Sequence, residues 1–99
     1  MEKLELILKA EAENSTAFSE QAWEDYLYWQ THDKKILQRI NALLKEIMRS
    51  PYAGTGKPEA LKHALAGYWS RRIDHVNRLV YRADDHDSVI LSCRYHYSK

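Results

Sequence analysis

The chain has 99 residues, one cysteine and a formal net charge of +1, and this length predicts a single domain that can bury a core. With Cys93 as the sole cysteine, no disulfide can form within the chain, and this cysteine usage is typical of a reducing compartment. No apolar run reaches transmembrane length, and the acidic start, MEKLELILKAEAEN, lacks the basic region of a secretory signal. We therefore expect a cytoplasmic protein with no membrane partner.

The charges are segregated along the chain. Residues 1–33 hold eight acids and two lysines, residues 34–82 hold eleven lysines and arginines against three acids, and residues 83–99 hold three acids and two basic residues. A basic segment of this kind is typical of a nucleic-acid or acidic-protein partner. Charges that gather on solvated helix faces would give the same pattern, so both interpretations stay open at this point.

The sequence before residue 17 does not clearly favour one type of secondary structure. Residues 3–12 alternate apolar and polar positions as a strand does, but their composition favours a helix, and both remain possible. Asn14 to Thr16 predict a turn, and Ala17 and Phe18 a short strand. Ser19 is a good N-cap for a helix that would run to about His32. One face of that helix would carry Trp23, Tyr26, Leu27 and Gln30.

A second helix is predicted directly after the first. Asp33 can cap it, and Pro51 would stop it. Apolar residues recur at helical spacing at Ile36, Ile40, Leu43, Leu44 and Ile47. Because almost no loop separates the two helices, they should form a helical hairpin. The following segment, SPYAGTGKPEA, is rich in glycine and proline and predicts a loop.

The rest of the chain changes to a period of two. Residues 63–74, 77–84 and 88–97 predict three strands joined by short polar turns. Helices followed by strands are typical of an α+β domain, in which the N-terminal helical hairpin packs on one face of a twisted antiparallel sheet.

Arginines lie on strands that must pair with each other. If the turn covers Asp74 to Val76, then Arg72 faces Arg78 directly; a shorter or longer turn would instead place Ile73 or Arg71 opposite Arg78. Facing like charges are destabilising, and a phosphate between the two planar guanidinium groups would remove the repulsion.

On the last strand, Arg94 and His96 would share a side, which makes His96 a plausible titrating group beside the arginines. The alternative is that the arginines extend over the sheet edge toward water and that His96 is simply a frayed end. The five histidines are scattered and a lone cysteine cannot build a zinc site, so we predict no metal. The stretch GTGKPE does not have Walker spacing, and we predict no cofactor.

Five segments, in the order WEDYLYWQ, KPEALKH, GYWSRRI, HVNRLVY and CRYHY, closely resemble the YoeB (Txe) toxins of bacterial type II toxin–antitoxin modules, within the RelE superfamily. The resemblance runs from about Ser19 to Tyr97. It implies a RelE-like, microbial-ribonuclease-like fold for a single toxin domain over residues 16–99, with residues 1–15 as an N-terminal extension. It also implies an endoribonuclease that cuts messenger RNA in the ribosomal A site.

The resemblance assigns roles to individual residues. In KPEALKH the glutamate is Glu59, which would act as general base, and the histidine of CRYHY is His96, which would act as general acid. The arginine of HVNRLVY is Arg78, which would bind and stabilise the scissile phosphate. The expected substrate-binding residues are Lys62, Arg72, Tyr97 and Arg71.

The implied partners are a YefM-type antitoxin, the 70S ribosome with its mRNA, operator DNA reached indirectly through the antitoxin, and a second copy of the chain in a homodimer. Two alternatives stay open: a nuclease that acts on free nucleic acid without the ribosome, and a non-enzymatic co-repressor that acts with the antitoxin. Two departures from the family pattern are the N-terminal extension and the extra residues Ser98 and Lys99, which extend past the last motif.

Overall fold

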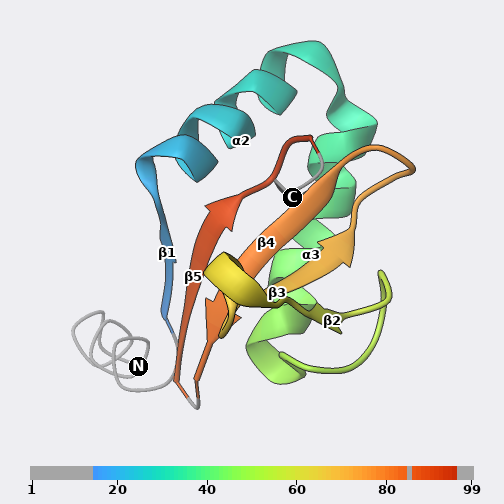
Figure 1. The fold of residues 1–99 in the computed structure, drawn as a ribbon. Helices are drawn as coiled ribbons and strands as arrows, with labels where there is room; N and C mark the ends of the chain where they lie inside the picture. Colours follow the sequence, from blue (N-terminus) through green and yellow to red (C-terminus); the bar gives the residue numbers. More distant parts are fainter. Residues whose placement is uncertain (1–14, 85, 96–99) are drawn as a thin grey trace, which may run out of the picture.

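The computed structural model describes residues 15–84 and 86–95 (Figure 1). The elements, in chain order, are β1 (Ser15–Phe18), α2 (Glu20–His32), α3 (Lys34–Arg49), β2 (Glu59–Ala60), the short 3-10 helix η1 (His63–Leu65), β3 (Trp69–Arg72), β4 (Arg78–Ala83) and β5 (Asp87–Ser92). Within the described residues, no helix is long and apolar enough to cross a bilayer. The strand or helix considered for residues 3–12 lies outside the described residues.

The strands form one sheet in the order β1-β5-β4-β3-β2. The β2–β3, β3–β4 and β4–β5 pairs are antiparallel, whereas β1 pairs with β5 in parallel. Parallel neighbours need a long crossover connection, and here both helices and three strands separate β1 from β5 along the chain. The predicted α+β class is confirmed, and the sheet is mixed where a wholly antiparallel one was expected.

Both helices start at the predicted caps. The Ser19 hydroxyl accepts a hydrogen bond from the Ala22 N–H at 3.0 Å and donates one to the Leu91 carbonyl at 2.7 Å, so it caps α2 and ties it to β5. The Asp33 carboxylate accepts from the N–H groups of Lys35 and Ile36 at 3.0 and 3.2 Å. Such caps satisfy N–H groups that the first helical turn leaves without partners.

The predicted apolar face of α2 is not its buried face. The helix buries Ala22, Asp25 and Trp29, whereas Trp23 is 50% exposed and Leu27 41% exposed. Hydrogen bonds to the Cys93 backbone set this orientation, because Trp29 Nε1 donates to its carbonyl at 2.8 Å and the Asp25 carboxylate accepts from its N–H at 3.0 Å. Contacts with a distant segment, and not the spacing of the large residues, therefore decide which face of α2 is buried.

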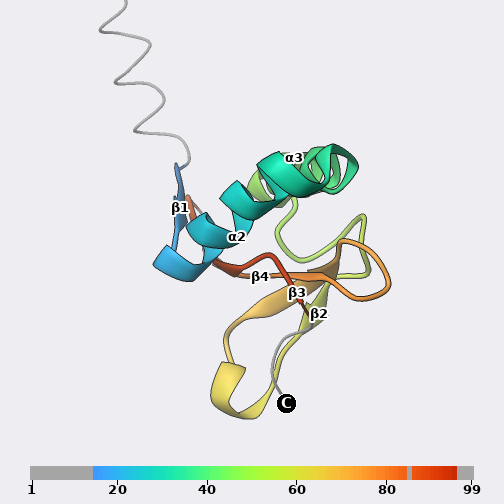
Figure 2. The same cartoon turned by 90° about the horizontal axis from the view of Figure 1, so that it is seen from above.

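The helices cover one face of the sheet, and the other face carries no α-helix (Figure 2). The core lies between α3 and the central strands and includes Ile40, Leu43, Ile47, Leu79, Tyr81 and Ile90. The predicted spacing on α3 is confirmed, since Ile40, Leu43 and Ile47 are buried. We call the other side the open face; η1 stands on it (Figure 2).

Several predicted strand boundaries are wrong. The turn expected at Asn14 to Thr16 is a strand from Ser15 onward, and the loop expected up to residue 60 ends in β2. Of the strand predicted for residues 63–74, only Trp69–Arg72 forms, because His63 and Gly67 adopt positive φ values of 57° and 94° that interrupt an extended chain. The last strand ends at Ser92.

Candidate functional site

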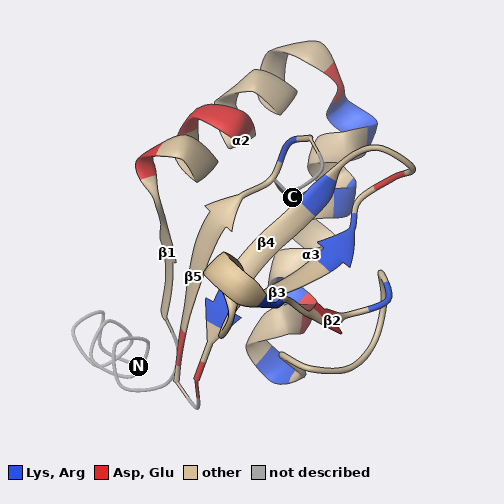
Figure 3. Cartoon of the chain, in the orientation of Figure 1, with Lys and Arg blue, Asp and Glu red and all other residues tan. Residues whose placement is uncertain are grey.

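The β3–β4 pairing places two arginines opposite each other on the open face. Arg72 pairs with Arg78, as expected for the three-residue turn, and Arg71 pairs with Leu79. Because successive side chains of a strand point to opposite faces and Leu79 belongs to the helix-covered core, Arg72 and Arg78 point to the open face. Figure 3 shows these basic positions on neighbouring strands at one end of the sheet.

The turn between these strands is built around Asp74. Its Oδ1 atom accepts hydrogen bonds from the N–H groups of Val76 at 2.8 Å and Asn77 at 2.6 Å. Burial alone would raise the pKa of Asp74, but the hydrogen bonds from Asn77 and Val76 and the charge of Arg78 lower it below its ordinary value. The turn therefore keeps an ionised carboxylate behind Arg78 at neutral pH.

Arg78 is held by the same turn. Its Nη1 atom donates to the carbonyl of Asp74 at 2.8 Å and to that of Asn77 at 3.1 Å. These contacts occupy one side of the guanidinium group, which is partly buried. For Arg72, in contrast, no side-chain hydrogen bond is found within the described part of the chain, and this residue is exposed. In this pair, Arg78 is held in one orientation by its hydrogen bonds, whereas the side chain of Arg72 can adjust to a ligand.

Arg71 is not part of this pair. Its side chain is completely buried, and it forms an ion pair with Glu46 at 2.5 Å. It also donates to the carbonyls of Ser50, Ala53 and Thr55 and to the Tyr81 hydroxyl, the last at 3.1 Å. The structure places Arg71 in the core behind the sheet, so we leave it out of the substrate-binding set that was expected from the sequence.

Glu59 reaches the open face from β2. It pairs with Ser70, which lies two residues before Arg72 on β3 and therefore on the same side of that strand. The preceding loop is fixed by a hydrogen bond of 2.7 Å from the Arg72 N–H to the Gly56 carbonyl. Gly56 has φ of +87°, and a Cβ there would come within 3.1 Å of the Arg72 carbonyl oxygen, so this close approach favours glycine.

The end of the described chain lies beside Arg78. The Tyr95 N–H donates to Asn77 Oδ1 at 2.6 Å, and the Arg78 N–H donates to the Tyr95 carbonyl at 2.9 Å. His96 and Tyr97, the predicted acid and its neighbour, lie outside the described residues. Asn77, which is buried, connects the arginine turn to this segment; its role was missed because an isolated asparagine before a strand carries no distinctive sequence signal.

Lys62 is exposed on the segment between β2 and η1. The structure thus brings Glu59, Arg72 and Arg78 to one face of the sheet and leaves Arg71 inside. Among the described residues, no group of three histidine, cysteine or carboxylate side chains is arranged to hold a metal ion. A face with two close cations and a carboxylate can bind a phosphodiester and take up a proton beside it.

Comparison with known proteins identifies the family. A family model for the YoeB-like toxin of bacterial type II toxin-antitoxin system matches residues 18–97. The toxin YoeB of Escherichia coli (strain K12) is 55% identical over 80 residues, which cover 81% of this chain and 95% of that protein.

Two solved structures from Staphylococcus aureus have the same fold. The YoeB dimer superposes with a TM-score of 0.79 at 54% identity and covers 85% of this chain and 98% of its own. The heterotetrameric YoeB–YefM toxin–antitoxin complex superposes with a TM-score of 0.78 at 54% identity and the same coverage. With the architecture and the spacing of the motifs in agreement, this chain belongs to the family of YoeB-like toxins of bacterial type II toxin–antitoxin systems.

Proposed function

We propose that this toxin is a metal-independent endoribonuclease that cleaves messenger RNA in the ribosomal A site. The observation that carries the proposal is the direct pairing of Arg72 with Arg78 on the open face, with Glu59 on the same face of the sheet. Two guanidinium groups that face each other repel unless an anion lies between them. A phosphodiester is an anion whose oxygens suit their planar geometry.

In the proposed reaction, the Glu59 carboxylate takes the proton of the ribose 2′-hydroxyl, and the 2′-oxygen attacks the adjacent phosphorus. The bond from phosphorus to the 5′-oxygen breaks, and the imidazolium of His96 donates a proton to that leaving oxygen. The products are a 2′,3′-cyclic phosphate and a 5′-hydroxyl. Each proton transfer is assigned to a side chain, so the chemistry needs no metal ion, and DNA lacks the nucleophile.

Arg78 would stabilise the negative charge that grows on the phosphate. Support comes from its contacts, because the carbonyls of Asp74 and Asn77 hold its Nη1 atom in place and little reorganisation is then needed. Arg72 and Lys62 would add positive charge, and Tyr97 would help to position the substrate. Tyr95, which directly precedes His96 in the sequence, is bonded through its backbone to Arg78 and Asn77, and we infer that His96 acts near the same phosphate.

The partners follow from the related complexes. The S. aureus relatives form a dimer and a heterotetramer with YefM, and we infer a homodimer and a YefM-type antitoxin for this chain as well. The antitoxin would provide the contact with operator DNA. Since the proposed substrate is mRNA on the 70S ribosome, the toxin would act in the cytoplasm, with residues 16–99 as its catalytic domain.

The test uses purified protein, a Glu59→Ala variant and ribosomes that carry a defined messenger, with EDTA-treated naked RNA in parallel. We expect cleavage in the A-site codon only on ribosomes, loss of cleavage in the variant, and a 5′-hydroxyl on the downstream product. Glu59→Ala should still bind the antitoxin. Cleavage of naked RNA at the same enzyme concentration would instead support a ribosome-independent nuclease.

The turnover rates of two variants can distinguish a specific contact of Arg78 with the phosphate from a general effect of positive charge. Arg78→Ala should lower turnover on ribosomes by about 100-fold, the usual effect of removing one oriented transition-state donor, and Lys62→Ala should lower it much less. Cleavage should also depend on pH with a bell shape, because one group must be deprotonated and another protonated. Equal losses in the two variants, or a flat pH profile, would contradict these assignments.

A further inference from the structure

The open face carries a second arginine site on β4, away from the Arg72–Arg78 pair. Arg82 lies four residues after Arg78 on the same strand, so both side chains point to the same face, about 13 Å apart along the strand. Figure 3 shows the two basic positions at opposite ends of β4. A single strand of RNA that is bound at Arg78 could therefore reach Arg82 with a flanking nucleotide.

Arg82 lies over an aromatic ring, as Arg94 does elsewhere in the described chain. Its guanidinium carbon lies 5.6 Å from the centre of the Tyr68 ring, and within residues 15–84 and 86–95 no hydrogen bond from its side chain is found. The side chain is exposed, and Tyr68 is partly buried at the base of the loop that carries η1. Arginine planes and tyrosine rings are the surfaces on which proteins stack unpaired RNA bases.

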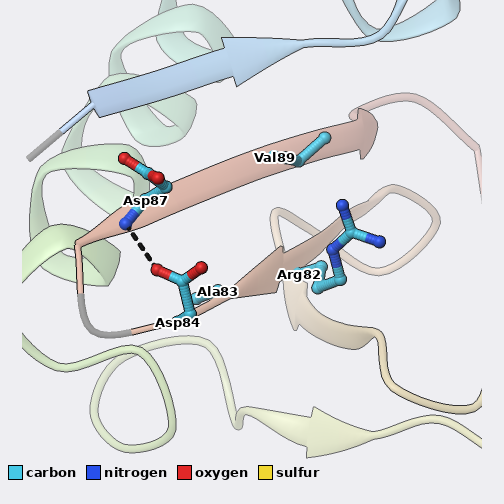
Figure 4. A pocket seen from close by; sticks show the side chains of 5 residues that line it. All are labelled: Arg82, Ala83, Asp84, Asp87 and Val89. Carbon is cyan, nitrogen blue, oxygen red and sulfur yellow. Dashed lines mark hydrogen bonds between the residues drawn. The ribbon is translucent and has the colours of Figure 1, made fainter.

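Beside Arg82 is a pocket of about 210 Å³, lined by Arg82, Ala83, Asp84, Asp87 and Val89 (Figure 4). Asp84 Oδ1 accepts the N–H groups of His86 at 2.9 Å and Asp87 at 2.8 Å, and Asp87 Oδ1 accepts the Ser15 hydroxyl at 2.6 Å. These hydrogen bonds use the Oδ1 atom of each carboxylate. Hydrogen bonds from the backbone of Asp87 and His86 lower the pKa of Asp84, so it stays ionised at neutral pH.

The charges of this pocket restrict what it can bind. Two carboxylates repel a phosphate, and the guanidinium group offsets one of their two negative charges and so weakens the attraction for a cation. Together they fit a neutral, planar group that stacks on Arg82 and donates N–H bonds to a carboxylate oxygen. The volume is smaller than that of whole small-molecule sites, which span about 300–1,000 Å³, so one base fits better than an entire nucleotide.

We propose that this pocket binds one base of the substrate RNA that flanks the scissile phosphate, and that it prefers bases with an exocyclic amino group (adenine, cytosine or guanine) over uracil. A carboxylate accepts a hydrogen bond from such an amino group, whereas the corresponding edge of uracil carries a carbonyl oxygen. The inference rests on the proposed ribonuclease function and extends it to base selection by Asp84, Asp87 and Arg82. Tyr68 does not line the pocket and would act by supporting the Arg82 guanidinium group.

The test measures kcat/KM on ribosomes with messengers that differ by one base at each position flanking the cut. Wild type should cut the uracil messenger about tenfold more slowly at one position, as expected for a hydrogen bond to a charged acceptor. Asp84→Asn and Asp87→Asn keep an oxygen for the turn but replace the other by a donor, and they should reduce this preference to about twofold. Glu20→Gln, on α2, should leave the preference unchanged.

The stacking role has its own matched pair of variants. Tyr68→Leu removes the ring and should raise KM about tenfold for every base with kcat unchanged, whereas Tyr68→Phe keeps the ring and should behave as wild type. In a second measurement, fluorescence anisotropy reports the binding of short adenine and uracil RNA oligomers to full-length Glu59→Ala, with and without Asp84→Asn. Tighter binding of the adenine oligomer that Asp84→Asn abolishes is the expected result.

These arms separate the two proposals. If wild type cuts no messenger but the binding preference and its loss in Asp84→Asn are seen, the ribonuclease assignment fails and the base pocket stands. If base preference is the same in wild type, Asp84→Asn and Asp87→Asn in both arms, the pocket proposal is overturned. It is equally overturned if these variants leave cutting and RNA binding unchanged and only weaken the complex with a YefM-type antitoxin, because the pocket would then be a protein docking site.

Discussion

Replacement of Arg71 by methionine tests whether the buried guanidinium holds the fold together. Arg71→Met keeps a long, unbranched side chain but removes the charge that pairs with Glu46 at 2.5 Å. It also removes the donors to the carbonyls of Ser50, Ala53 and Thr55. The loop between α3 and β2 would lose the group around which it is wrapped.

The expected loss can be worked from these contacts. Removal of one partner of a buried ion pair typically costs about 3–5 kcal/mol. The carbonyls of Ser50, Ala53 and Thr55 belong to exposed residues, so water can reach them and we add no cost for them. The Glu46 side chain is 27% exposed, so water can solvate the carboxylate that remains. We therefore expect Arg71→Met to lower the free energy of unfolding by about 4 kcal/mol, near the middle of the ion-pair range.

Urea unfolding followed by tryptophan fluorescence measures this quantity. With a slope of about 2 kcal/mol per molar urea, typical of small domains, the midpoint should fall by about 2 M. Arg71→Lys is the matched control; it keeps the charge but cannot reach several carbonyls at once, so its loss should be smaller. If Arg71→Met lowers the unfolding free energy by less than about 1 kcal/mol, the buried guanidinium group does not hold the fold together, because apolar packing would then replace the whole cluster.

Three further predictions concern stability and reactivity. Hydrogen bonds from Thr55 and the charge of Arg71 lower the pKa of Glu46 below its ordinary value. The contribution of Glu46 to the free energy of unfolding should therefore be fully present above about pH 5 and be lost as the pH falls through the lowered pKa. In urea titrations at different pH values, Glu46→Gln should reduce the loss of stability on the acid side. Burial raises the pKa of the Cys93 thiol to about 12, so iodoacetamide should label it at pH 8 only after unfolding. Ser19→Ala removes the cap of α2 and its bond to Leu91, and the free energy of unfolding should fall by about 1–2 kcal/mol.

Each of these has an outcome that contradicts it. An unchanged acid-side slope in Glu46→Gln would mean that other carboxylates, such as Asp74, account for the pH dependence. Labelling of native Cys93 at the rate of an exposed thiol would show that the strand end opens frequently. A neutral Ser19→Ala would mean that water replaces the hydroxyl at both the Ala22 N–H and the Leu91 carbonyl.

The local parts of the fold were predictable from the sequence, because short-range signals specify them. Ser19 and Asp33 cap the helices at the expected residues, and the apolar spacing on α3 predicts its buried residues. The sequence left three registers open for Arg78, and the structure has the one that a three-residue turn gives, with Arg72 opposite Arg78. Much of the candidate site follows from that hairpin alone.

From the residues alone we could thus predict the α+β class, the two helices and the resemblance to the YoeB toxins, whereas the register of the arginine-bearing strands stayed open. Three features needed the folded chain: the buried side of α2, the parallel pairing of β1 with β5, and the burial of Arg71 beside an exposed Arg72. The physical reason is that these outcomes depend on partners far away in the chain, such as Cys93 for Trp29 and Glu46 for Arg71, and no local pattern encodes those contacts.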